Sequence, residues 1–229
     1  TESLRAYDPA ENPEQRPQEI LQETIEKILD KIEESHRPVL SPGNGVRLAG
    51  AIEEFHELVD VLGVPVVTGM SSVDALESDH PYFVGRSGGT GTRPGNFALQ
   101  NSDVLLSIGN RQGFAQTGFQ YQDWARESYT ILNDIDENEL KKPNLHVSLP
   151  VVGDAGELIR GLLAEAKKRG ADKGYPLFKG EDWRKQCLLW KKKYPIVTEK
   201  HYETLEEGCT NIYAFYGELS KAMKENETL

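Results

Sequence analysis

The chain has 229 residues, of which 38% are hydrophobic and 28% are charged, so it is long enough and apolar enough to bury a substantial core. Its formal net charge of −11 argues against broad attraction to nucleic acid or anionic lipid, because phosphate-binding surfaces normally carry a basic excess. No apolar run approaches the roughly 20 residues that cross a membrane, and no secretory signal opens the sequence. We therefore expect a cytoplasmic protein with no nucleic-acid or membrane partner.

The cysteines and histidines show no metal-ligand spacing. Cys187 and Cys209 belong to no CxxC pair, so we expect two reduced thiols. The five histidines form no HExxH or comparable motif, which argues against structural zinc. No nucleophile, histidine and acid are arranged as a catalytic set. The sequence therefore predicts neither a metal ligand nor a catalytic residue.

The first half of the chain alternates between helical and extended patterns. Residues 1–17 hold three prolines and few apolar side chains, so we expect a surface linker. From residue 18 the apolar residues recur at helical spacing, and they do so again within residues 48–62. Short apolar runs at residues 38–41 and 64–67 predict buried strands on either side of the second helix. Strand, glycine turn, helix and strand predict a βαβ unit.

The second half continues the alternation. The expected elements, in chain order, are a glycine-rich loop at 85–95, a short helix at 96–100, strands at 104–108, 129–132 and 146–149, and a helix after residue 154. Five or six parallel strands with helices between them predict an open, doubly wound α/β sheet.

Beyond this sheet, a polar, glycine-bearing hinge is expected at residues 170–180. The tail that follows has a helical stripe of Trp183, Cys187 and Trp190 and a last helix at residues 212–223. Its aromatic side chains exceed what a short tail can bury against itself. We expect them to pack on the main domain, or on protein outside this sequence.

Candidate ligand-binding residues follow the strands, where open α/β sheets usually bind ligands. The turn Gly43-Asn44-Gly45 resembles a dinucleotide-binding turn, but the next glycine is Gly50, so GxGxxG is not satisfied. No acidic residue directly follows the strand at 64–67, which also argues against ordinary nicotinamide binding. No GxxxxGK[ST] motif exists, which excludes P-loop phosphoryl transfer.

The glycine-rich stretch from Gly85 to Gly95 has two interpretations. It is either a flexible surface loop or a backbone whose N–H groups meet the phosphate or ribityl oxygens of an extended ligand. Arg86 and Arg93 could neutralise phosphate, although an exposed loop arginine is more often only solvated. Arg111 is the stronger candidate, because it comes just after a buried strand.

Asp134 and Asp136 alternate with Ile135 at a strand end, so their carboxylates should lie on one side. Such a pair can bind metal or exchange protons. The run that begins at Asp136 also looks like a helix start, for which Asp136 would be the N-cap. Capping and binding of a ligand hydroxyl are compatible there.

Five stretches carry a family pattern in a fixed order. They are RPVLSPGNGVRLAGA, VPVVTGM, GRSGGTGTRPGNFALQNSDVLLSIGNR, ILNDIDENELKK and VSLPVVGDAGELI, and together they span most of the sequence between the linker and the hinge. This set resembles the central domain of thiamine diphosphate-dependent enzymes of the acetolactate synthase, pyruvate oxidase and benzoylformate decarboxylase group. The resemblance implies a three-layer, doubly wound, mostly parallel sheet, Rossmann-like and of the DHS-like NAD/FAD-binding type, with an extended helical C-terminal tail.

The resemblance also implies a domain organisation. Residues 1–17 would be the linker from a pyrimidine-binding domain, residues 18–169 the central domain, and residues 170–229 a tail leading to a diphosphate-binding domain. The parent enzyme would be an acetolactate synthase-like homo-oligomer that acts on 2-oxo acids. Its thiamine diphosphate and Mg²⁺ sites would lie in those two partner domains. The alternative is a stand-alone nucleotide-binding or sensor module without catalysis.

By position, the resemblance implies a set of cofactor-binding residues, namely Gly43, Asn44, Gly45, Arg47, Thr68, Gly69, Met70, Gly89, Thr90, Gly91, Asn96, Asn110, Arg111, Asp134, Ile135, Asp136 and Glu139. The expected occupant is FAD or ADP, and an empty site also stays open. Two loops that face the flavin in the family differ here, at residues 86–91 and in the QGFAQTG that follows Arg111.

Overall fold

The computed structural model describes Asp8, residues 19–203 and residues 208–224. Within them a six-stranded sheet has the order β3-β2-β1-β4-β5-β6, and every strand pair is parallel. The strands are β1 (Pro38–Pro42), β2 (Val66–Thr68), β3 (Phe83–Arg86), β4 (Val104–Ile108), β5 (Tyr129–Asp134) and β6 (Leu149–Val152). This arrangement confirms the predicted doubly wound α/β fold. The predicted linker at 1–17, apart from Asp8, lies outside the described residues.

The two central strands, β1 and β4, are buried along their whole length. They pair in register from Pro38 opposite Val104 to Pro42 opposite Ile108. Apolar runs buried on both faces are expected where helices cover both sides of a parallel sheet. Because the chain order reverses between these two strands, their carboxyl ends flank the point where such sheets bind ligands.

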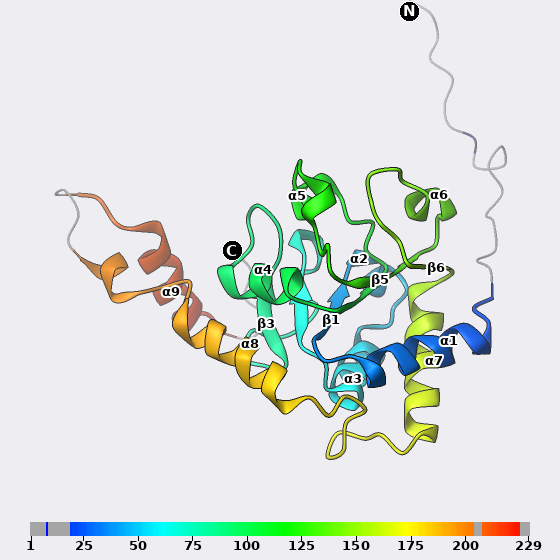
Figure 1. The fold of residues 1–229 in the computed structure, drawn as a ribbon. Coiled ribbons are helices and arrows are strands. Elements are labelled where there is room, and N and C mark those ends of the chain that lie inside the picture. The colour runs from blue at the N-terminus through cyan, green and yellow to red at the C-terminus, as the bar shows by residue number, and fades with distance from the viewer. Residues whose placement is uncertain (1–7, 9–18, 204–207, 225–229) are drawn as a thin grey trace, which may run out of the picture.

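Helices cover the sheet in two groups, which lie on opposite sides of it in Figure 1. The first group is α1 (Gln22–Glu34), α3 (Ile52–Leu62) and α7 (Ala155–Lys168), which pack on one another. In the second group, α4 (Arg93–Gln100) packs on β3 and on α8 (Glu181–Lys193). No described helix has the length and apolar character needed to span a membrane.

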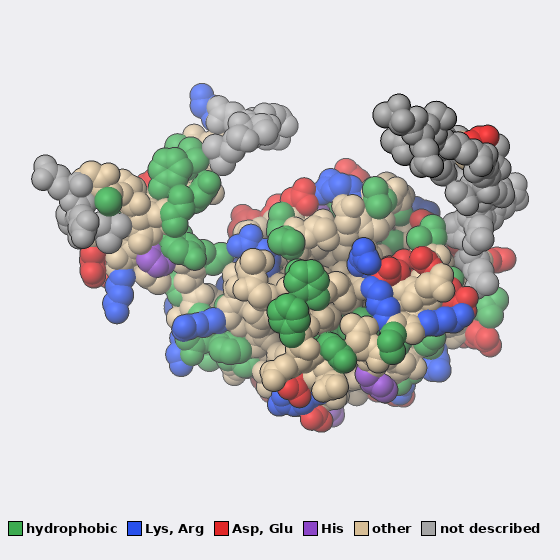
Figure 2. Space-filling view, turned by 90° about the horizontal axis from the view of Figure 1, so that it is seen from above, with side chains coloured by type: hydrophobic (Ala, Val, Ile, Leu, Met, Phe, Trp, Pro, Cys, Tyr) green, Lys and Arg blue, Asp and Glu red, His purple; other side chains and the backbone are tan. Residues whose placement is uncertain are grey.

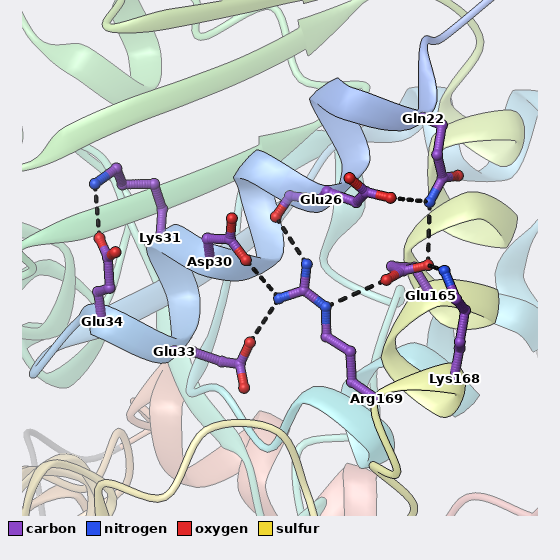
Figure 3. A network of polar contacts seen from close by, with 9 residues as sticks. All are labelled: Gln22, Glu26, Asp30, Lys31, Glu33, Glu34, Glu165, Lys168 and Arg169. Atoms are coloured by element: carbon purple, nitrogen blue, oxygen red, sulfur yellow. Dashed lines mark hydrogen bonds and ion pairs between the residues drawn. The ribbon is translucent and has the colours of Figure 1, made fainter.

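A polar network fastens α1 to the end of α7 (Figure 3). The Arg169 guanidinium lies 2.6 Å from carboxylate oxygens of both Asp30 and Glu33, and it also donates to Glu165. Burial works against the charged form, yet the hydrogen bonds that Arg169 donates to Asp30 and Glu33 raise the pKa of Arg169 above its usual range. The position of α7, whose first residues border the candidate site, is thereby fixed by α1.

Three elements differ from the sequence-based prediction, each for a local reason. The helix expected over 48–62 is split into α2 (Asn44–Leu48) and α3, because the chain turns at Gly50 with φ +64°. Strand β3 was missed, because this four-residue edge strand contains Gly85 and leads into the glycine-rich loop. Strand β6 lies three residues later than expected and includes Pro150, which an edge strand tolerates.

The C-terminal segment divides into a packed part and an exposed part. Trp183 and Cys187 of α8 are buried, and the Trp183 indole N–H donates to Pro38 O at 2.9 Å. In α9 (Ile212–Ala222), by contrast, Tyr213 and Phe215 are about half exposed. The expectation that the tail packs on the main domain is therefore confirmed for α8 but not for α9.

Candidate functional site

A cavity of about 480 Å³ lies at the carboxyl edge of the sheet, above β1, β4 and β5. Its lining combines turn, strand-end and helix-start residues, namely Asn44, Gly45, Leu48, Ala49, Ser71, Gly109, Asn110, Arg111, Asn133, Asp134, Ile135, Asp154 and Ala155. We call this cavity the crevice. It occupies the position at which the reversed strand order predicts ligand binding.

Glycines let two backbone turns meet at the bottom of the crevice. Gly43 N–H donates to Ile108 O at 2.8 Å, and Gly45 N–H donates to Gly109 O at 2.9 Å. A Cβ added to Gly43 would overlap the carbonyl oxygen of Gly109. Gly109 itself has φ +57° and lies against Gly45. Both N–H groups therefore donate to backbone carbonyls at the end of β4, and they do not form a phosphate-binding turn of the GxGxxG kind.

The floor of the crevice depends on Asn133, which the sequence analysis did not select. Its Oδ1 accepts from Gly109 N–H at 3.1 Å, and its Nδ2 donates to Val151 O at 3.1 Å and to Gly153 O at 3.0 Å. One buried side chain thus ties β4, β5 and β6 together at their carboxyl ends. A polar residue that ends the apolar run Ile131-Leu132 was the available signal.

Charged side chains border one side of the crevice. Arg111 is 71% exposed, and its Nη2 lies 3.3 Å from Glu139 Oε1. Lys142 contacts the same carboxylate and donates to Arg111 O at 3.1 Å. Burial raises the pKa of Asp134 above its ordinary value, although its carboxylate accepts from the N–H of Asp136. This side therefore offers one exposed guanidinium for an anion and one carboxylate for hydroxyl groups.

Asp136 has the capping role predicted for it. Its Oδ1 accepts from Asn138 N–H at 2.9 Å at the start of α6 (Glu137–Leu140). Asp154, which the sequence analysis did not select as a site residue, caps α7 by accepting from Gly156 N–H and Glu157 N–H. Of the pair Asp134 and Asp136, only Asp134 lines the crevice.

Apolar side chains stand exposed at the mouth of the crevice. Leu48 is 80% exposed and Ile135 is 59% exposed. Figure 2, which views the molecule from above Figure 1, shows separate hydrophobic groups on this face among acidic and basic ones. Leu48 and Ile135 could hold a flat, apolar ring over the polar floor.

The glycine-rich loop between β3 and α4 is closed on itself. Asn96 Oδ1 accepts from Gly88 N–H at 2.9 Å, and Asn96 Nδ2 donates back to Gly88 O at 3.1 Å. Gly91 N–H donates to Gly88 O at 3.0 Å. Thr92 caps α4 by accepting from Gly95 N–H. Several of the N–H groups expected to meet a ligand are therefore already paired.

The short helix α5 (Phe114–Thr117) lies beside two of the predicted ligand-facing glycines. A Cβ added to Gly69 would lie 2.5 Å from the Gln116 side-chain nitrogen, and one added to Gly88 would lie 2.5 Å from Ala115 O. Gly89 N–H donates to the same Ala115 oxygen at 3.0 Å. We call the space between Gly69 and Gly88 the notch. Residues of α5 fill it.

The predicted site residues therefore fall into separate groups. The crevice brings together Asn44, Gly45, Asn110, Arg111, Asp134 and Ile135. Thr90 and Gly91 line a second cavity instead. Arg47 pairs with Asp74 at 2.8 Å, and Met70 is exposed. Thr68 is fully buried, and its Oγ1 has no hydrogen-bond partner.

Comparisons with known proteins agree on one family. Residues 25–162 match the family described as thiamine pyrophosphate enzyme, central domain. The chain is 39% identical over 133 residues to a probable acetolactate synthase large subunit of Methanocaldococcus jannaschii, a match that covers 58% of this chain and 22% of that protein. An acetolactate synthase large subunit of Porphyra purpurea is 30% identical over 169 residues, which cover 74% of this chain and 28% of the relative. The chain thus spans less than a third of the length of these relatives.

Proposed function

Since the chain belongs to the thiamine pyrophosphate enzyme family through its central domain, we propose that it is the nucleotide-binding middle domain of a larger, acetolactate synthase-like enzyme. That enzyme would form or break a carbon–carbon bond beside the carbonyl of a 2-oxo acid. Thiamine diphosphate, held with Mg²⁺ in partner domains, would supply carbanion stabilisation when bound. The names of the relatives support this assignment, and no observation favours a stand-alone module.

Within that enzyme the residues of this chain would position the partner domains. Residues 1–17 would connect to a pyrimidine-binding domain and residues 170–229 to a diphosphate-binding domain. The half-exposed aromatics of α9 support the second connection, because large exposed apolar side chains commonly mark a contact surface. The parent protein would assemble as a homo-oligomer.

We propose that the crevice binds an adenine nucleotide. Its volume of about 480 Å³ falls within the range of roughly 300–1,000 Å³ that is usual for small-molecule pockets. The carboxylate of Asp134 would accept from ribose hydroxyls, and Arg111 would meet a phosphate. Leu48 and Ile135 would pack on the adenine ring. The observation that supports this proposal is that all four of these side chains line one cavity.

The filled notch favours ADP over FAD as the occupant. FAD contains an adenine nucleotide and a second, flavin-bearing nucleotide, so it must extend beyond a site for one nucleotide. In the family pattern that extension passes Gly69 and Gly88. Here Gln116 and Ala115 occupy that path, and FAD would have to displace α5. We therefore expect FAD to bind more weakly than ADP.

Titrations of the 229-residue chain with ADP and with FAD test this proposal. We expect saturable ADP binding that Arg111→Ala weakens about tenfold, which corresponds to one charged hydrogen bond. Arg126→Ala is the matched control, because Arg126 is also exposed and, among the residues that the structure describes, its ion pair is with neighbouring Glu127. FAD that binds as tightly as ADP would contradict the preference, and binding of neither would contradict the nucleotide site.

The catalytic part of the proposal needs a separate assay. Pyruvate, thiamine diphosphate and magnesium should give no turnover above background with this chain alone. Activity that increases with the concentration of the chain would show that its own residues are catalytic, contrary to the proposal.

A further inference from the structure

A second cavity, of about 610 Å³, lies between the glycine-rich loop and the segment that follows α8. One wall comes from Arg86 and residues 90–93, and the other from residues 193–201 together with Tyr213. The cavity shares no lining residue with the crevice. Figure 1 shows the chain that directly follows α8 on the side of the molecule that carries β3 and α4. We call this cavity the arm cavity.

The charge of the arm cavity is opposite to that of the chain. The sequence has 37 acidic residues and 26 lysines and arginines, yet none of the acidic residues that the structure describes lines this cavity. Arg86, Arg93 and Lys193 all do. Within the described residues, none of the three forms an ion pair with a carboxylate. The cavity therefore presents a basic surface that the protein itself does not neutralise.

Two of these cations converge on one aromatic ring. The Arg93 guanidinium lies 5.6 Å from the centroid of Tyr194, and the Lys193 ammonium lies 5.4 Å from it. Tyr194 is held in turn by an edge-on contact with Phe97, at 5.6 Å between centroids. An anion in the cavity would be attracted by both of these positive charges.

One neutral donor borders the same space. His201 Nδ1 accepts from Thr198 N–H at 3.1 Å, which leaves the proton of a neutral imidazole on Nε2 as a donor. The His201 ring stacks on Tyr213 at 4.9 Å, which fixes its plane.

We propose that the arm cavity binds the phosphate group of a small molecule. Arginine and lysine from separate segments, together with an imidazole donor, suit the several oxygens of a phosphate better than the two of a single carboxylate. The volume suits a small molecule rather than a protein segment. The glycine-rich loop forms one wall of this cavity and the chain that follows α8 forms the other, so an occupant would hold these two segments together.

Isothermal titration of the 229-residue chain with pyrophosphate tests this site. We expect saturable binding that Arg86→Gln/Arg93→Gln weakens at least tenfold. The control Arg126→Gln/Lys192→Gln removes the same charge from exposed residues outside the cavity and should change the affinity less than twofold. Equal weakening by both pairs would reduce the binding to general electrostatics and overturn the proposal, as would no saturable binding.

Two further arms complete the test. If the loop variants do not give the circular dichroism spectrum of the unaltered chain, the comparison is repeated on α8. Lys193→Gln, inside the cavity, should then weaken binding, whereas Lys192→Gln, outside it, should not. Inorganic phosphate and glycerol phosphate, which lacks the adenine that the crevice is proposed to bind, then separate a free anion from a phosphate ester. Citrate bound as tightly as pyrophosphate would contradict selectivity for phosphate.

Discussion

The two halves of the sheet's carboxyl edge use glycine in opposite ways. Over β1 and β4, Gly43 and Gly45 let backbone segments touch, and the side chains of Arg111 and Asp134 line the crevice that lies above this contact. Over β2 and β3, the glycines admit the chain's own α5. A glycine-rich loop is therefore not by itself an open ligand site. What decides is whether its polar groups are already paired within the protein.

The largest expected effect tests the close backbone contact of the first half. Gly43→Ala places a methyl group against Gly109 O, so we expect a loss of about 3 kcal/mol in the free energy of unfolding, at the upper end of overpacking costs. Urea denaturation measures this loss. Gly113→Ala is the control, because a Cβ at Gly113 has no neighbour within 4 Å, and its cost should stay within about 0.5 kcal/mol. Equal stability of the two variants would contradict the packing argument.

The sequence was most informative where burial alone decides the structure. Strand β4 was predicted to its observed ends, because an apolar run buried on both faces has one consistent interpretation. Gly43 and Gly45 were recognised as turn residues, but their role in contacting Gly109 depends on a strand far away in sequence. Asn133 was missed for the same reason, because its three partners lie at the carboxyl ends of β4 and β6.

The filled notch lay beyond sequence reasoning. It requires Gly69 and Gly88 to lie against Gln116, and no periodicity or spacing in the sequence encodes that contact. The family pattern placed ligand contacts in these two loops, and the divergence of residues 86–91 and of the QGFAQTG segment was the available signal. Residues of that segment now form α5.

A second prediction compares the two asparagines that organise the two halves. Asn133→Ala removes the amide that donates to two carbonyls and one of the two acceptors of the Gly109 N–H, so we expect a loss of about 2 kcal/mol in the free energy of unfolding. Asn96→Ala removes two bonds from a partly exposed loop and should cost about 1 kcal/mol.

Hydrogen exchange distinguishes the two asparagine variants. Asn96→Ala should speed exchange at the amides of Gly88 and Gly89 without affecting β4, whereas Asn133→Ala should affect Gly109 first. If Asn96→Ala destabilises the whole chain as strongly as Asn133→Ala, the glycine-rich loop is part of the core, and the contrast between the halves is lost.

The smallest expected effect concerns the charge of Asp134. Burial raises the pKa of this carboxyl in the folded chain, so the folded state holds its proton to higher pH than the unfolded state does. Stability contributed by this group is therefore lost as pH rises through the carboxyl range. Asp134→Asn keeps the oxygen that accepts from the Asp136 N–H and removes the buried charge. We expect the variant to match or slightly exceed the unaltered chain at pH 7, with the difference vanishing near pH 3.

Denaturation at a series of pH values measures that difference, and Asp123→Asn, at an exposed position in a 3₁₀ turn, is the control. The same Asp134→Asn variant should bind ADP more weakly, because an amide is a poorer acceptor for ribose hydroxyls than a carboxylate. A crevice built for a ligand would thus give up a little stability for a charge that the ligand uses. A variant that loses both stability and ADP binding would instead make Asp134 a structural residue, and the first half of the edge would be no more open than the second.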